Sequence, residues 1–204
     1  MQLSPEKILQ FWFADTANDP ARAAARNEFW FKSSSATDTL IREQFSPAIE
    51  AAARGELAAW ADTPRSALAL VLLLDQFPRN IWRGTARAFA HDPQALTAAQ
   101  RAVAFEYLRQ LMPVEQAFLL LPYQHSESIE NQRESVRLSD EITMAAPPAW
   151  RPLMEYYSKF AKQHRDLIER FGRFPHRNRV LGRESRAEEE AYLRAGGMTF
   201  GQGG

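Results

Sequence analysis

Alanine and leucine dominate the apolar residues of this chain, and that balance constrains its fold more than any other feature. The sequence has 32 Ala and 20 Leu, against 5 Val and 7 Ile, in 204 residues. Ala and Leu lose little side-chain freedom in a helix, whereas β-branched residues lose rotamers there and suit pleated sheets. Apolar residues make up 45% of the chain, which is enough to close a core. The balance predicts an all-α fold.

Local signals agree with this class. A residue with a capping oxygen stands directly before proline at Ser4-Pro5, Thr63-Pro64 and Asp92-Pro93. Such pairs are typical of helix starts, where proline's missing N–H costs nothing. The stretch from Pro64 to Phe77 is apolar on every side over Ala67–Leu74, which predicts a helix buried all round. Between Trp150 and Phe171 apolar residues recur at steps of three or four, which predicts a long amphipathic helix.

Nothing in the sequence divides the chain. It shows no strand alternation, no low-complexity linker and no repeat of fixed period. We therefore expect a single helical domain over residues 1–195, built as an antiparallel helix array, followed by a flexible glycine-rich tail over 196–204.

Composition excludes several classes of protein. Without cysteine there is no disulfide, thiolate zinc site or iron–sulfur cluster. The formal net charge is zero, so the cationic surplus typical of nucleic-acid binders is missing. The longest apolar run, 67–74, is far shorter than the roughly 20 residues of a membrane span, and the N-terminus lacks a signal-peptide pattern. We expect a cytoplasmic protein with no nucleic acid, membrane, metal or cofactor as partner; its oligomeric state stays open.

Three apolar stretches each lead through a proline into polar and ionisable residues. They are Leu72–Asn80, Phe118–Glu127 and Phe171–Asn178. Proline should stop or bend each helix at this point. If the three helix ends converge, nine candidate ligand-binding residues would surround one cavity. These are Asp75, Arg79, Asn80, Arg83, His125, Glu127, His176, Arg177 and Asn178.

Arginine and asparagine suit a carboxylate or phosphate ligand, and histidine beside a carboxylate can move a proton. Arg79-Asn80 and Arg177-Asn178 are each followed at the same spacing by a glycine, which suggests one turn used twice. Around these two pairs arginines outnumber the nearby acids, so an anionic ligand is expected there. The competing interpretation is that Arg, His and Asn simply cap helix C-termini, whose carbonyls lack partners.

These same motifs resemble a known family. The resemblance rests on Leu74–Asn80 with Arg83-Gly84-Thr85, on Pro122–Glu127, on Phe171–Asn178 with Leu181-Gly182-Arg183, and on Phe29-Trp30-Phe31. Together they resemble the bacterial domain-of-unknown-function family 924 over nearly the whole chain. The resemblance implies a single helical domain similar to a tetratricopeptide-repeat superhelix, and it implies no reaction.

Three functions stay open at this point. The leading hypothesis is a binding module for a peptide or a small anionic ligand. The second is a hydrolase- or transferase-type enzyme with His125 or His176 as general base, oriented by Glu127 or Asp75. The third is a structural or assembly role. A deep pocket with a histidine–carboxylate contact would favour the enzyme, an open groove the binding module, and dispersed helix ends the structural role.

Overall fold

The structure is a computed structural model that describes residues 3–201. Within this range every regular element is helical and no strand occurs, so the all-α class is confirmed. The α-helices are α1 (Pro5–Phe13), α2 (Pro20–Ala25), α3 (Asn27–Phe31), α4 (Ser35–Ala53), α5 (Pro64–Val71), α6 (Phe77–Ile81), α7 (Asp92–Ala104), α8 (Pro113–Leu119), α9 (Leu121–His125), α10 (Ile129–Ala145), α11 (Arg151–Phe171) and α12 (Ala187–Arg194). Short 3-10 turns form η1 (Ala58–Asp62), η3 (Ala86–Phe89), η4 (Tyr107–Gln110) and η5 (Pro175–Arg177), and η2 (Leu72–Gln76) is a π-helical turn.

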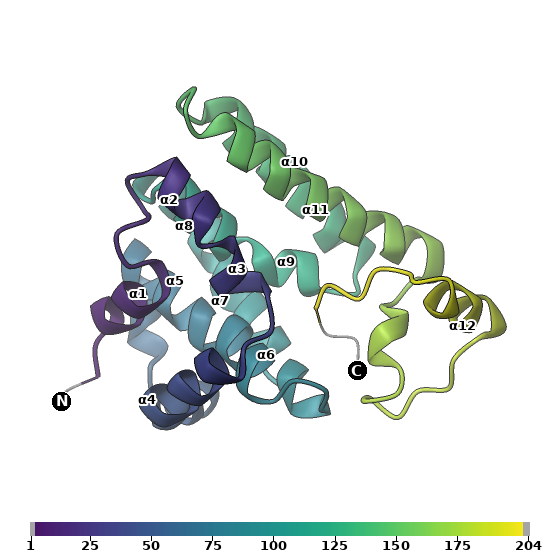
Figure 1. Cartoon of the computed structure of the whole chain (residues 1–204). Helices are drawn as coiled ribbons and strands as arrows, with labels where there is room; N and C mark the ends of the chain where they lie inside the picture. The colour runs from purple at the N-terminus through teal and green to yellow at the C-terminus, as the bar shows by residue number, and fades with distance from the viewer. Residues whose placement is uncertain (1–2, 202–204) are drawn as a thin grey trace.

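Helix α5 is the centre of the body of the molecule. Residues 67–74, in α5 and η2, are all buried, as their apolar pattern predicts. Helices α1 and α7 pack against α5 (Figure 1), and the aromatic rings of Trp12, Phe45 and Phe77 fill the space around it. Burying such side chains contributes about 1.5–3 kcal/mol each relative to exposure, so this cluster is a main source of stability.

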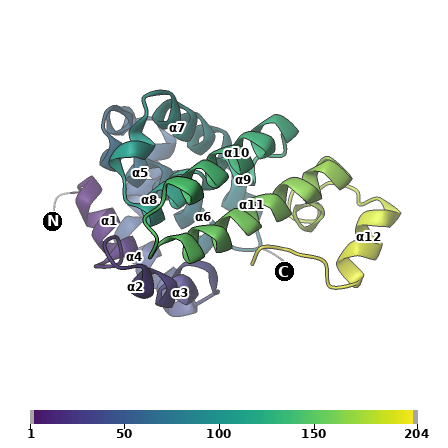
Figure 2. The same cartoon turned by 90° about the horizontal axis from the view of Figure 1, so that it is seen from above.

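Helices α10 and α11 form a long hairpin that lies across the body (Figure 1). The predicted long amphipathic helix is α11, whose buried face includes Leu153, Tyr157 and Leu167. Seen from above, the outer end of α11 extends beyond the body and carries α12 (Figure 2). There a second, smaller apolar cluster forms from Leu167, Ile168, Phe171 and Phe174.

The described part of the tail folds back from α12 towards the body (Figure 1). The Met198 amide donates a hydrogen bond to the Tyr192 hydroxyl, and the ring of Phe200 stacks on His164 with 3.6 Å between centroids. The flexible tail was expected over 196–204, of which residues 202–204 lie outside the described range. The domain boundary at 195 and the mobility of the tail stay predictions.

The capping signals are used in two ways. Ser4 caps α1 by accepting a hydrogen bond from the Lys7 amide at 3.3 Å. Asp92 instead lies inside the first turn of α7, where His91 is the N-cap residue, and its carboxylate binds arginine side chains. Among the described residues, no helix combines the length and apolar character needed to cross a membrane.

Candidate functional site

A pocket of about 280 Å³ lies where the three polar helix ends meet. It is bounded by α6, α9, α11 and η5, with α3, α8, α10 and the tail completing the wall. Six of the nine candidate residues line it: Arg79, Asn80, Arg83, His125, His176 and Arg177. The three helix ends therefore converge, whereas a ligand-binding role for these residues stays a prediction.

The first helix end reaches the pocket through the π-helical turn η2. Pro78 was expected to stop or bend a helix, and it stands instead in the first turn of α6, directly after η2. The wider turn, in which the Phe77 amide donates to the Leu72 carbonyl, carries the helix on through the proline to Ile81. Such π turns are uncommon and occur often at functional sites. Asp75 and Arg79 therefore lie on one continuous helical segment, and their side chains contact each other.

The second and third helix ends show the same use of proline. Pro122 is the second residue of α9, which carries His125 at its end. At the third helix end, α11 ends at Phe171 and Gly172 follows in the left-handed region (φ 70°). Pro175 then begins the 3-10 turn η5. In all three cases the proline therefore lies at the first or second position of the short helical segment that presents the polar side chains.

His125 and Asp75 form a buried pair at the pocket wall. His125 Nδ1 lies 2.7 Å from Asp75 Oδ1, and Asp75 is fully buried behind the ring. Burial and the charge of Arg79 lower the pKa of His125, although Asp75 acts in the opposite direction, so the ring is neutral at pH 7. A neutral ring beside a carboxylate holds its proton on Nδ1 and leaves a lone pair on Nε2.

Asp75 stays ionised in this setting. Burial by itself would raise the pKa of its carboxyl group, but Arg79 and the hydrogen bonds from His125 and Gln76 hold that pKa below its usual range. The Gln76 amide donates to Asp75 Oδ2 at 2.6 Å, so both carboxylate oxygens have partners. A buried carboxylate that is satisfied in this way can keep its charge and fix the orientation of His125.

Arg79 and Arg177 meet at Asp92. Arg79 binds Asp92 through both terminal nitrogens at 2.8 Å, and one of these nitrogens also lies 3.1 Å from Asp75. Arg177 Nη1 donates to the Asp92 carboxylate at 3.4 Å and to the His125 backbone carbonyl at 3.0 Å. These contacts join η2, α6, α7, α9 and η5 in one network beside the pocket.

Carboxylates from distant elements form ion pairs with most of the arginines that the sequence places around the pocket. Arg83 lies 3.7 Å from Asp38, and Arg87 binds Glu50. The remaining pairs are Arg79 and Arg177 with Asp92, Arg173 with Glu189, and Arg183 with Glu127. The local excess of arginine is therefore largely balanced, because α4, α7 and α12 supply carboxylates that the local sequence does not reveal.

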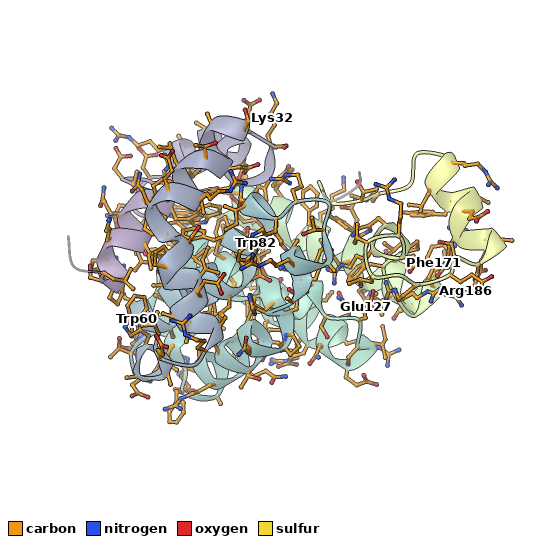
Figure 3. The ribbon with its side chains drawn as sticks, turned by 90° about the horizontal axis from the view of Figure 1, so that it is seen from below. Lys32, Trp60, Trp82, Glu127, Phe171 and Arg186 are labelled. Carbon is orange, nitrogen blue, oxygen red and sulfur yellow. The ribbon has the colours of Figure 1, made fainter. Side chains whose placement is uncertain are left out.

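Three candidate residues lie behind the pocket wall and support it. Asp75 lies beneath His125 as described. Glu127 accepts hydrogen bonds from the Phe174 amide at 2.7 Å and from Arg183. These bonds join the outer end of the molecule to its body, and Figure 3 shows Glu127 between these two parts. Asn178 is buried and donates to Glu189 at 3.1 Å.

Sequence reasoning missed several side chains that line the pocket or support it. Asp92 was assigned to capping because it precedes a proline, and Phe200 lies in a glycine-rich tail. His164 is a buried core histidine whose Nδ1 bonds the Phe160 carbonyl at 2.8 Å, and its ring also lines the pocket. Trp30 and Phe31 form an aromatic wall of the pocket, whereas their sequence pattern indicated only the family resemblance. An isolated aromatic residue in a tail carries no periodic signal that could place it here.

Comparison with known proteins agrees with the sequence resemblance. Residues 8–197 match the family DUF924, described as a bacterial protein of unknown function. The chain belongs to this family. It is also similar to the solved "Protein of Unknown Function ATU0120" from Agrobacterium tumefaciens, with 38% sequence identity over 94% of this chain and 97% of the other and a TM-score of 0.79. Among curated proteins none matches.

We expect Asp75→Ala to destabilise the protein by about 2–4 kcal/mol, because it leaves the charge of Arg79 partly unpaired in the interior. The matched control is Asp62→Ala, which removes an exposed carboxylate paired with Arg101 and should change stability by less than about 0.5 kcal/mol. Urea unfolding of the two variants and the parent measures both values. Equal midpoints for Asp75→Ala and the parent would contradict the buried pairing.

A second expectation concerns pH. Burial and the charge of Arg177 lower the pKa of His176 from 6.5 to about 3, so the unfolded chain binds a proton in this window that the folded protein does not. Stability should therefore fall as the pH drops from 6.5 towards 3. His176→Phe should reduce that fall by about 1.4 kcal/mol per pH unit between about pH 5.5 and 4. Unfolding free energies measured across this range test it, and an unchanged slope would contradict a neutral, half-buried His176.

Proposed function

We propose that the protein is a hydrolase- or transferase-type enzyme that acts on a small molecule in this pocket, with His125 as general base. The observation that carries the proposal is the 2.7 Å contact between His125 Nδ1 and the buried, ionised Asp75. A carboxylate that fixes the tautomer and orientation of a histidine is the arrangement by which many enzymes prepare a base.

The pair supports a specific proton transfer. Asp75 would hold the proton on Nδ1, so Nε2 would take a proton from a water or alcohol that attacks the substrate. The developing imidazolium would be stabilised by Asp75 and would return the proton to the leaving group. The lowered pKa of His125 favours this role, because the ring is neutral and able to accept a proton at pH 7.

The hydroxyls of Ser158 and Thr143 in the pocket wall bond to groups other than His125, which favours water or a second substrate as the nucleophile. Ser158 donates to Asp140 at 2.6 Å and Thr143 donates to the Ser139 carbonyl at 2.8 Å. Within residues 3–201 no serine or threonine hydroxyl bonds to His125, so a side-chain nucleophile of the Ser–His type has no support.

A binding module without catalysis is the second candidate. The buried Arg177 at the pocket wall supports it, because a guanidinium can hold a carboxylate without any reaction. A volume of about 280 Å³ suits a small molecule better than a peptide. Such a binding module would use the concave face of a tetratricopeptide-like superhelix. The packing of α10 against α11 as a hairpin supports such a superhelix.

A substitution at His125 separates the two candidates. The substrates are small chromogenic esters, anilides and phosphate esters, assayed with and without an added alcohol acceptor. His125→Asn keeps an N–H donor for Asp75 but lacks the basic Nε2, so turnover should fall by roughly 10²–10⁴-fold. His91→Gln, at a histidine outside the pocket wall, is the matched control and should keep the parent rate.

Two outcomes would count against the enzyme. Equal rates for His125→Asn and the parent would show that any turnover does not depend on His125. No turnover of any ester, anilide or phosphate ester would reject hydrolysis and transfer of these groups and leave the binding module.

A further inference from the structure

The pocket wall has two chemically different ends. At one end the rings of Trp30, Phe31 and Phe118 touch one another, with 4.9 Å between the centroids of Trp30 and Phe118 and 5.7 Å between those of Phe31 and Phe118. Phe31 and Tyr156, which also line the pocket, are 45% and 46% exposed, so this end opens to solvent. The other end contains Arg177, which is buried, and His125 and His176, which are half-buried. A ligand that fits both ends must be amphipathic.

Arg177 is a buried cation at the polar end that keeps bonding capacity. It is 6% exposed, and among residues 3–201 its Nη2 makes no hydrogen bond; Nε is enclosed without a partner, whereas Nη2 is not enclosed. The guanidinium lies over the rings of Phe89 and Phe174, at 4.6 and 4.3 Å from their centroids. Its partners are one weak contact to Asp92 and one carbonyl. Both terminal nitrogens of Arg79, by contrast, bind Asp92, and one of them also contacts Asp75.

Burial without sufficient partners is costly for a guanidinium. Loss of hydration, together with the charge of Arg79, lowers the pKa of Arg177 to about 10. An unpaired N–H in the interior costs about 1–3 kcal/mol, and a ligand oxygen at Nη2 would supply the missing acceptor. The side chain is therefore prepared for an acceptor that the rest of the protein does not supply.

The charge of the ligand follows from the network. Arg79 and Arg177 are balanced by Asp75 and Asp92, while His125 and His176 are neutral at pH 7. A dianion such as a phosphate monoester would lie close to two carboxylates without a matching surplus of positive charge. A single negative charge, paired with Arg177, meets much less repulsion.

We infer that the pocket takes a small monocarboxylate with an apolar body, whose carboxylate group binds Arg177 and whose body lies against Trp30, Phe31 and Phe118. At roughly 30 Å³ for each water-sized volume, the cavity has room for on the order of ten non-hydrogen atoms. The inference rests on the proposed function, because it names the class of molecule on which His125 would act.

Octanoate is a probe of this size and chemistry. Isothermal titration at fixed ionic strength should show that it binds more tightly than octanamide, which lacks the charge, and than octyl phosphate, which can carry two charges. Acetate should bind much more weakly than octanoate, because it lacks the apolar body. Octanamide binding as tightly as octanoate, or octyl phosphate binding more tightly, would overturn the inference.

Two pairs of variants test the two ends separately. Arg177→Met should weaken octanoate binding roughly 10- to 100-fold, whereas Arg179→Met, at an exposed arginine two residues away, should not. Phe31→Ala should weaken it by about 3- to 10-fold, whereas Phe105→Ala, at an exposed ring outside the pocket wall, should not. Phe31 is half exposed, so its variant keeps the test valid even where Arg177→Met fails to fold. Parent-like affinity in Phe31→Ala or in a folded Arg177→Met would overturn the inference.

His125→Asn distinguishes this inference from the proposed function. The variant should bind octanoate within about threefold of the parent while losing turnover. Octanoate binding without any His125-dependent turnover would sustain the carboxylate site and reject the enzyme. His125-dependent turnover of neutral esters without octanoate binding would sustain the enzyme and reject the carboxylate site.

Discussion

Asp92 accepts hydrogen bonds from both Arg79 and Arg177, and the arrangement of the pocket depends on this shared carboxylate. The two guanidiniums are 5% and 6% exposed, so each would carry a penalty of several kcal/mol without an acid beside it. Pairing both with one acid at the start of α7 fixes α6 and η5 relative to each other. Arg79 then continues the chain of contacts to Asp75, and Asp75 to His125. Convergence of the three helix ends and orientation of the histidine thus have one electrostatic cause.

The backbone at Asp75 serves the same network. A regular helix through Pro78 would lose a hydrogen bond and meet the proline ring, so the chain widens into the π turn η2. This turn lies in the most apolar part of the fold, where the surrounding core holds it in place. A carboxylate is thereby presented from a rigid, buried element, as the positioning of a catalytic or binding group requires. Glu127 does similar work at the outer end, where it joins Phe174 and Arg183 to α9.

Much of the fold could be predicted because it is written in local patterns. The abundance of Ala and Leu predicts helices, and the all-round apolar run at 67–74 predicts the buried central one. In three places apolar residues are followed by a proline and then by polar residues. This repeated order was enough to identify the three helix ends that form one cavity. The partners of the arginines could not be predicted in this way, because Asp38, Asp92 and Glu189 reach them only after distant helices pack. The sequence Asp92-Pro93 is compatible with a helix N-cap as well as with an ion pair. Phe200 has no apolar neighbours at helical spacing that would indicate a buried face.

The contact with Asp75 fixes His125 as a neutral ring with its proton on Nδ1 and a free lone pair on Nε2. Nitrogen-15 NMR of the histidine rings at pH 7 reads the protonation of each nitrogen directly, with His125→Asn to assign the signals. We predict a neutral His125 with a protonated Nδ1 and an unprotonated Nε2, and loss of this preference in Asp75→Asn. A doubly protonated ring at pH 7, or a neutral ring protonated on Nε2, would contradict it.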